Sequence, residues 1–250
     1  MSEIKQWFLG LPQFTRYWFG LSVVFPLAGR IGLLSPYHMI LTTDLINKFQ
    51  LWRPLTALFF YPMKFHYLIN LYFLYSYSIR LENEQFNGRP ADYLFLLIFN
   101  WFSIVIISLA MNVMLLMDPM VLSVLYIWCN LNKDIIVNFW FGTQFKALYL
   151  PWVLLGFNII MGGGGVDEII GIIVGHLYYF IMYRYPEEHG GQSLLQTPSI
   201  LYNYFPSTPG RGSVYGGFQY QPPPQRSNDQ NNQRGSGRHN WGSGNVLGNN

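Results

Sequence analysis

A histidine directly follows two glycines whose spacing suits close helix packing. Gly171 and Gly175 are four residues apart in a long apolar stretch, and His176 comes next. Glycines at this spacing leave a groove on one helix face where a second backbone can approach. An ionisable side chain beside that groove is costly within a membrane unless it faces protein or water. We therefore interpret His176 as a buried polar group that hydrogen-bonds across helices or lines a wet cavity, unless a nucleophile accompanies it.

The sequence offers no convincing nucleophile for a histidine-based hydrolase. Such a site needs a serine on a close-packed turn, with donors for an oxyanion. The serines of the apolar stretches are Ser22, Ser76, Ser78, Ser103, Ser108 and Ser123, and none lies in a Gly-x-Ser-Gly arrangement. The Gly-Ser-Gly runs at 235–237 and 242–244 lie in a polar tail, and Cys129 has no neighbour in sequence that would activate it. We therefore expect no catalytic residues and no enzyme activity.

A second polar pair, His66-x-x-x-Asn70, lies in another apolar stretch. Residues four apart share a helix face, so the pair predicts a small polar patch inside a bundle. An interfacial histidine beside a packing asparagine is the alternative. Asp118 is the main carboxylate expected within the membrane, next to a turn, and Cys and His spacings give no metal-binding pattern. We therefore expect no metal ion and no cofactor.

A tryptophan and an arginine, Trp52 and Arg53, follow the first apolar stretch. A guanidinium held near the headgroup layer by a neighbouring aromatic ring would form a rigid loop anchor. An ordinary interfacial anchor is the alternative.

Composition places the chain among multi-span membrane proteins. Hydrophobic residues make up 51% of the chain and charged residues 11%, whereas soluble domains carry about 25% charge. The basic residues form no patch interleaved with aromatic rings, which argues against nucleic-acid binding.

Six membrane spans are predicted, in an all-α membrane domain covering residues 1–185. The nearly continuous apolar run at 93–131 would be about 58 Å long as one helix, roughly twice a ~30 Å hydrocarbon core, so it must contain two spans. The predicted spans are 17–34, 55–79, 93–111, 119–131, 147–161 and 166–183. Lys and Arg residues on the side of the termini outnumber those on the other side by eleven to four, which predicts cytosolic termini.

The remaining residues, 186–250, are rich in Gly, Pro, Ser, Asn and Gln and predict a disordered tail. Near its end Trp241 and Leu247 stand isolated among glycines and polar residues. They are typical of a short docking motif that orders on binding a partner. A hydrophobic accident in low-complexity sequence is the alternative.

These features together resemble a rhomboid-type six-span fold, and more closely the Derlin family, near its founding member. The resemblance is carried by a Trp-Arg loop, His-x-x-x-Asn in the second span and Gly-x-x-x-Gly-His in the sixth. The more specific runs are TRYWF (15–19), LWRPLTALFFYP (51–62), NLYFLY (70–75), NGRPADYLF (87–95), FWFGTQFKALYLPWVLLGFN (139–158), VGHLYYF (174–180) and RHNWGSG (238–244). The Gly-x-Ser-Gly of active rhomboid proteases is missing.

The resemblance implies an inactive rhomboid of the endoplasmic reticulum (ER) membrane that acts in ER-associated degradation. It would help misfolded proteins return to the cytosol through a channel or a thinned membrane, as a homo- or hetero-oligomer. The segment 241–248 resembles the family's docking motif for the valosin-containing AAA ATPase, with Trp241, Gly242, Gly244 and Leu247 at matching positions. A membrane ubiquitin ligase complex is the other expected partner. An active rhomboid-type intramembrane protease and a passive scaffold for a ubiquitin ligase are the alternatives.

Overall fold

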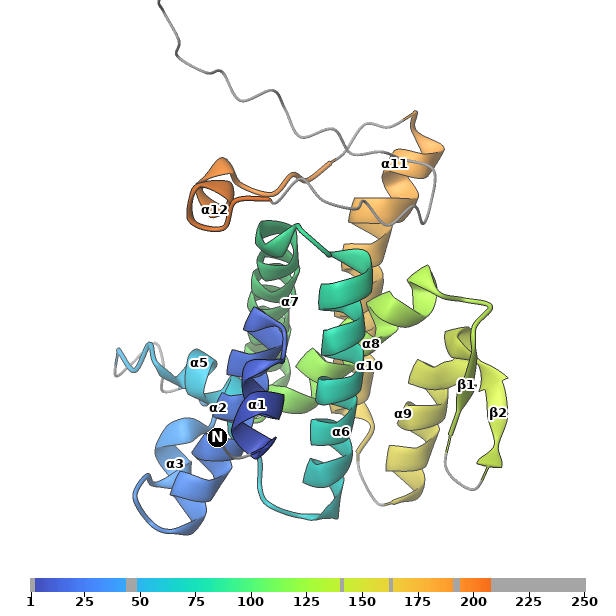
Figure 1. The fold of residues 1–250 in the computed structure, drawn as a ribbon. Coiled ribbons are helices and arrows are strands. Elements are labelled where there is room, and N and C mark those ends of the chain that lie inside the picture. The colour runs from blue at the N-terminus through green and yellow to red at the C-terminus, as the bar shows by residue number, and fades with distance from the viewer. Residues whose placement is uncertain (1–2, 44–48, 140–141, 162–163, 191–193, 208–250) are drawn as a thin grey trace, which may run out of the picture. The chain divides into compact units, whose positions relative to one another are not determined.

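Helix α8 (Met117–Leu131) is the centre of the fold, and its residues from Met117 to Asn130 are all buried. The computed structural model describes residues 3–43, 49–139, 142–161, 164–190 and 194–207, which belong to a single unit of the chain. Helices α6, α7 and α10 all pack against α8, and α10 does so most extensively (Figure 1). The other helices are α1 (Glu3–Leu9), α2 (Gln13–Arg30), α3 (Pro36–Met39), α5 (Arg53–Phe59), α6 (Phe65–Arg80), α7 (Pro90–Met111), α9 (Leu150–Ile160), α10 (Val166–Tyr179), α11 (Tyr185–Glu188) and α12 (Ser199–Tyr204).

The expected all-helical architecture is confirmed, because each of the six segments predicted to span the membrane contains a helix. Among the described residues, two continuous helical segments are long and apolar enough to cross a bilayer by length and composition, Pro90–Met111 and Val166–Glu188. Two shorter apolar helices, Met117–Leu131 and Ala147–Ile160, lie between them in sequence. The second of the long segments is continuous because a π-helical turn, η4 (Phe180–Arg184), joins α10 to α11.

The predicted span 55–79 is broken near Tyr61 and Pro62, as the proline in its sequence leads one to expect. Helix α5 ends at Phe59, an extended segment follows, and α6 begins at Phe65. Pro62 lies in this break, and a proline biases the residue before it towards extended conformations. The break places Tyr61 and His66 together at the start of α6, where their ring centroids are 5.9 Å apart.

The long apolar run at 93–131 is divided, as its length requires. Asn112 adopts a left-handed conformation (φ 58°) and ends α7, its N–H donating to the carbonyl of Ser108. Asparagine tolerates this conformation better than most residues, which makes it a suitable helix terminator. Residues 113–116 then connect α7 to α8.

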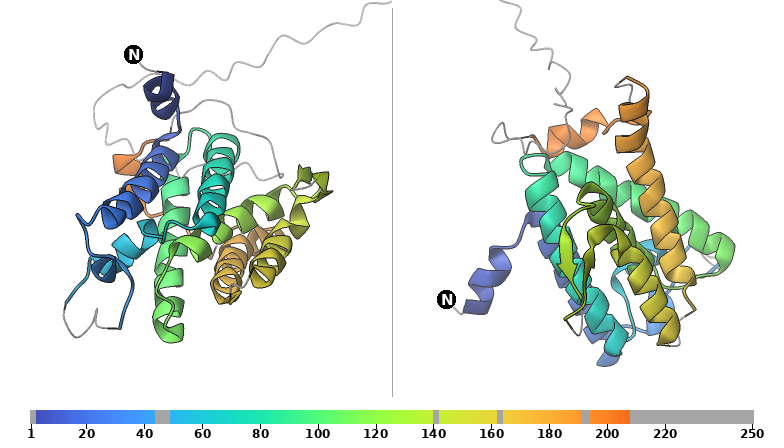
Figure 2. Two further views of the ribbon diagram at one scale, coloured as in Figure 1. Left: turned by 90° about the horizontal axis from the view of Figure 1, so that it is seen from below. Right: turned by 90° about the vertical axis from the view of Figure 1, so that its right-hand side faces the viewer.

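A short β-hairpin, which the sequence did not predict, connects α8 to α9. Strands β1 (Ile136–Asn138) and β2 (Gln144–Lys146) pair antiparallel, with Val137 opposite Phe145. Figure 2 shows the hairpin from two further directions, beside α9. A short 3₁₀ turn, η3 (Ala147–Tyr149), leads from β2 into α9.

The beginning of the predicted disordered tail is ordered in the structure. Helix α12 lies against the start of α7, and the hydroxyls of Thr197 and Tyr202 donate to the Asp92 carboxylate at 2.6 and 2.5 Å. The ring of Phe205 packs on that of Phe14, with centroids 5.2 Å apart. These aromatic and hydroxyl side chains give the segment contacts that its composition alone does not reveal. The predicted docking motif at 241–248, with Trp241, Gly242, Gly244 and Leu247, lies outside the described residues.

Candidate functional site

The two glycines singled out in the sequence let α10 approach α8 at backbone distance. A Cβ built on Gly171 would lie 2.6 Å from the carbonyl oxygen of Pro119, and one on Gly175 would lie 2.8 Å from that of Ser123. Both distances are shorter than real Cβ contacts, and the atoms met are backbone atoms that cannot swing aside. The Gly-x-x-x-Gly spacing therefore acts as a packing groove, with α8 seated in it.

His176 meets a tyrosine across this interface. The hydroxyl of Tyr126 on α8 lies 2.9 Å from Nδ1 of His176, and the two rings are nearly perpendicular. The expected hydrogen bond between helices is therefore present. The prediction that His176 is buried is wrong, because its side chain is exposed at the protein surface, next to the helix face that packs on α8.

The serine nearest this interface points elsewhere. Ser123 is fully buried, and its hydroxyl donates to the carbonyl of Met120 at 2.8 Å while accepting from Nδ2 of Asn100 at 3.1 Å. The Ser123 hydroxyl proton is therefore donated to a backbone carbonyl of α8, one turn earlier in the same helix. Among the hydrogen bonds of the described residues, His176 pairs with a phenol and not with a serine or cysteine. The arrangement offers cross-helix packing and no activated nucleophile.

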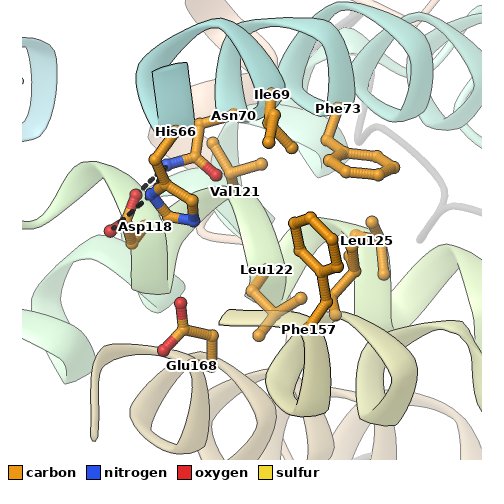
Figure 3. Close-up of a pocket in the computed structure, with 11 residues that line it drawn as sticks. His66, Ile69, Asn70, Phe73, Asp118, Val121, Leu122, Leu125, Phe157 and Glu168 are labelled. Carbon is orange, nitrogen blue, oxygen red and sulfur yellow. Dashed lines mark hydrogen bonds and ion pairs between the residues drawn. The ribbon is translucent and has the colours of Figure 1, made fainter. Parts of the chain in front are cut away.

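The second predicted pair, His66 and Asn70, is one side of a larger polar cluster. Nδ2 of Asn70 donates to Oδ1 of Asp118, and the hydroxyl of Tyr61 donates to Oδ2 at 2.9 Å. The same hydroxyl lies 2.9 Å from Nδ1 of His66, which is 3.8 Å from Oδ2 of Asp118. The predicted polar patch on α6 thus faces the first turn of α8 (Figure 3). Asp118 is only 5% exposed, so these bonds compensate much of its desolvation.

A second carboxylate, Glu168 of α10, joins this cluster. One ligand-type atom from each of His66, Asp118 and Glu168 lies within 4.8 Å of the other two. Nδ2 of Asn158 on α9 donates to Oε1 of Glu168. The expectation that Asp118 is the main carboxylate within the membrane is therefore incomplete, because Glu168 lies beside it. Fifty residues separate Asp118 from Glu168 in the chain, and only the close approach of α10 to α8 unites them.

The cluster borders a cavity of about 390 Å³ among α6, α9 and α10. Its lining mixes polar and apolar residues, and the polar ones are Tyr61, Lys64, His66, Asp118, Asn158, Asp167 and Glu168. A smaller space of about 30 Å³ continues between Asn70, Leu122 and Phe157. The larger cavity is big enough for several water molecules, and its polar groups can hydrogen-bond them.

Arg53 of the predicted loop anchor is held within the protein, and the aromatic ring beside its guanidinium is Tyr37 rather than Trp52. Arg53 is 1% exposed, and its NH1 donates to the carbonyls of Tyr37 and Ile40 at 2.9 and 3.1 Å. The guanidinium carbon lies 5.2 Å from the ring centroid of Tyr37, whereas Trp52 is half exposed. Arg53 therefore ties the segment after α2 to the start of α5. Being adjacent in sequence does not make Trp52 the stacking partner of Arg53.

Glu82 was missed by the sequence reading and caps α2 from a distant part of the chain. Its carboxylate accepts the backbone N–H groups of Phe14 and Thr15 at 3.0 and 2.8 Å, and the Thr15 hydroxyl at 2.7 Å. Negative charge at a helix N-terminus is favourable. Helix α2 has no side-chain cap at its own N-terminus, where Pro12 is the N-cap residue. This missing cap is the signal that could have indicated a partner such as Glu82 elsewhere in the chain.

Comparisons with known proteins find similar sequences along nearly the whole chain. A family profile described as the Der1-like family matches residues 11–199. Derlin-1 of Homo sapiens is 54% identical, over 99% of this chain and 99% of the human protein. Derlin-1 of Caenorhabditis elegans is 51% identical over 83% of this chain and 86% of its own length. Derlin-1 of Drosophila melanogaster is 41% identical over 98% of both chains.

Proposed function

Because this chain belongs to the Der1-like (Derlin) family, we propose that it provides the path by which misfolded proteins leave the endoplasmic reticulum. The members of this family are membrane proteins of the endoplasmic reticulum that take part in ER-associated degradation. This chain performs no covalent chemistry. It lowers the barrier to transit, and an ATPase bound to its C-terminal tail supplies the work.

The polar cavity beside short helices is the observation that carries this proposal. The α8 and Ala147–Ile160 helices are each roughly 21–23 Å long at ~1.5 Å per residue, shorter than a ~30 Å hydrocarbon core. Short spans are accommodated by thinning of the bilayer. The cavity of about 390 Å³ adds carboxylate, imidazole and amide groups among the same helices.

This combination addresses the main energetic obstacle to moving a polypeptide across a membrane. Each backbone polar group left unpaired in hydrocarbon costs several kcal/mol. A thinned bilayer shortens the apolar distance, and a wet polar cavity offers hydrogen bonds on the way. Neither effect requires a reaction, which suits a site where His176 faces Tyr126 and Ser123 donates to its own helix.

The tail gives the path a direction. Residues 241–248 carry the ATPase-docking motif, with Trp241 and Leu247 as its apolar anchors and Gly242 and Gly244 between them. Cytosolic termini, which the charge bias favours, would place the motif on the side where the valosin-containing ATPase pulls. A membrane ubiquitin ligase complex and further Derlin copies complete the assembly.

Site-specific photocrosslinking tests the path. A photoreactive residue replaces Ile69 on α6 or Phe157 on α9, which both line the cavity, and Phe102 on α7, which is 59% exposed, is the control position. A misfolded lumenal substrate arrested during export is expected to crosslink to positions 69 and 157 and not to 102. Equal labelling at all three positions would favour a passive ligase scaffold, and cleavage of the substrate would favour a protease.

The double variant Trp241→Ala/Leu247→Ala tests the docking motif separately. Pull-down of the ATPase is expected to be lost, while the membrane domain elutes unchanged in detergent. Retained pull-down would remove the motif from the proposal without affecting the crosslinking result.

A further inference from the structure

We propose that His66, Asp118 and Glu168 bind one divalent transition-metal cation of the Zn²⁺ type, at a site joining α6, α8 and α10. We call these three residues the His–Asp–Glu triad. The site goes beyond the export function proposed above and does not depend on it. It rests on the geometry of the triad and on one carboxylate oxygen that lacks a protein partner.

The triad has the ligand types and the spacing of a cation site. One ligand-type atom from each residue lies within 4.8 Å of the others, so a cation between them could reach all three with small side-chain adjustments. A neutral imidazole nitrogen and carboxylate oxygens are ligands of Zn²⁺ at distances of about 2.0–2.2 Å. Three protein ligands plus a water would complete a tetrahedral shell.

One oxygen of Glu168 is an independent sign that a ligand belongs there. Glu168 is 5% exposed, and its Oε2 is buried without a hydrogen-bond partner among the described residues. A buried carboxylate oxygen without a partner is costly, and native structures rarely leave one so. Its other oxygen, Oε1, accepts from Asn158, which leaves Oε2 as the oxygen open to a cation. Figure 3 shows the Glu168 side chain extending from α10 toward the Asp118 and His66 groups.

The hydrogen bonds around His66 prepare it as a ligand. Since the Tyr61 hydroxyl donates to Asp118, its oxygen can accept the Nδ1 proton of a neutral His66, 2.9 Å away. Nε2 of that tautomer then carries a lone pair. Metal-binding histidines characteristically donate their other ring N–H to a fixed acceptor in this way.

Neighbouring amides orient the two carboxylates in the same manner. Asn70 and Tyr61 donate to the two oxygens of Asp118, and Asn158 donates to one oxygen of Glu168, so both carboxylates are held in place by hydrogen bonds. Such outer contacts fix ligand orientation and tune affinity by about 10–100-fold. The adjacent cavity of about 390 Å³ provides an entry path for a hydrated ion.

The ligand set selects the class of cation. Ca²⁺ prefers six to eight oxygen ligands, and Mg²⁺ keeps most of its waters. An imidazole with two carboxylates suits Zn²⁺ and its first-row neighbours better. The cation also balances two carboxylates that are 5% exposed and close together, which would otherwise repel each other.

Metal binding by the full chain in detergent tests the site. The tag-free protein is stripped with EDTA, dialysed and titrated with Zn²⁺, with metal content measured by mass spectrometry. We expect about one equivalent bound tightly, with a rise in the unfolding temperature. Glu168→Gln and His66→Gln should each weaken Zn²⁺ binding by at least about tenfold.

Asp167→Asn is the matched control, because Asp167 lines the same cavity next to Glu168 but is not in the triad. It should bind Zn²⁺ with less than about twofold change in affinity. Zn²⁺ binding that Glu168→Gln leaves intact, or equal losses in Asp167→Asn, would overturn the site.

X-ray absorption at the zinc edge of the wild-type protein needs no variant and so does not depend on a variant folding. One imidazole with oxygen ligands is the expected shell. Sulfur ligation, several imidazoles or the absence of stoichiometric zinc would each overturn the proposal. None of these outcomes bears on crosslinking at positions 69 and 157, so the two proposals can fail separately.

Discussion

The Tyr126 hydroxyl lies 2.9 Å from Nδ1 of His176, which places a phenol beside the histidine where a serine hydrolase would need its nucleophile. Ser123, one turn earlier on α8, is fully buried and donates to Met120. At the interface between α8 and α10, His176 therefore pairs with Tyr126, and Ser123 pairs with its own helix.

A fluorophosphonate probe, which labels activated serines, is expected to leave Ser123 unlabelled in the purified protein. The reason is that its hydroxyl is buried and its proton is committed to a backbone carbonyl. Mass spectrometry of the wild-type protein and of Ser123→Ala should give the same background. Labelling of the wild type that disappears in Ser123→Ala would show an activated serine and contradict this view.

Substituting either groove glycine by alanine should destabilise the bundle. The added Cβ of Gly171→Ala or Gly175→Ala would meet backbone oxygens of α8 at 2.6 or 2.8 Å and push the two helices apart. Overpacking of this kind costs about 1–3 kcal/mol. The free energy of unfolding in mixed detergent and SDS micelles measures the effect.

Gly156→Ala provides the matched control for both glycines, since its Cβ would have no other heavy atom within 4 Å. It should leave stability unchanged or slightly raised, because alanine favours the helix over glycine by about 1 kcal/mol. Equal stability losses in all three variants would show that the groove is not the cause.

Arg53→Lys should loosen the segment between α3 and α5. A lysine keeps the charge but cannot donate to the Tyr37 and Ile40 carbonyls and the Gln50 side chain together, as the guanidinium does. Loss of charged hydrogen bonds of this kind costs roughly 1.5–3 kcal/mol each. Limited proteolysis should cut this segment faster in Arg53→Lys, whereas Arg30→Lys, at an exposed arginine, should behave like the wild type.

Thr197→Val should release α12 from the start of α7. Valine keeps the shape of threonine but removes the hydroxyl that donates to Asp92 at 2.6 Å, while the Tyr202 hydroxyl and the Arg89 ion pair stay in place. Hydrogen exchange of residues 199–204 should become faster by about ten- to a hundred-fold, given that a hydrogen bond to a charged group is worth about 1.5–3 kcal/mol. Glu187→Ala, at an exposed position nearby in sequence, is the control, and unchanged exchange in Thr197→Val would disprove the contact.

Local spacing predicted those features that depend on one helix or one pair of helices. The Gly171 and Gly175 groove, the polar face shared by His66 and Asn70, and the division of the run at 93–131 all follow from periodicity and length. In the structure α10 approaches α8 closely at both glycines, Asn70 donates to Asp118, and α7 and α8 are separate helices. Family resemblance supplied the rest of the functional expectation.

Features that depend on packing between distant segments could not be predicted in this way. Nothing in the sequence pairs Asp118 with Glu168, because their proximity results from the seating of α8 in the α10 groove. Tyr37 replaces Trp52 as the partner of Arg53 because the chain folds back between them. The hydroxyls that bind Asp92 lie in sequence whose composition is typical of disorder, and composition says nothing about a specific acceptor elsewhere.

The attachment of α12 to Asp92 also determines how mechanical load enters the molecule. Force applied to the chain beyond Phe205 would first act on the hydrogen bonds that Thr197 and Tyr202 donate to Asp92, at the start of α7. Only after these contacts break would the force reach α10 through the backbone. The interface between α10 and α8, and the cavity beside it, would thereby be protected from force that the proposed ATPase applies to the tail.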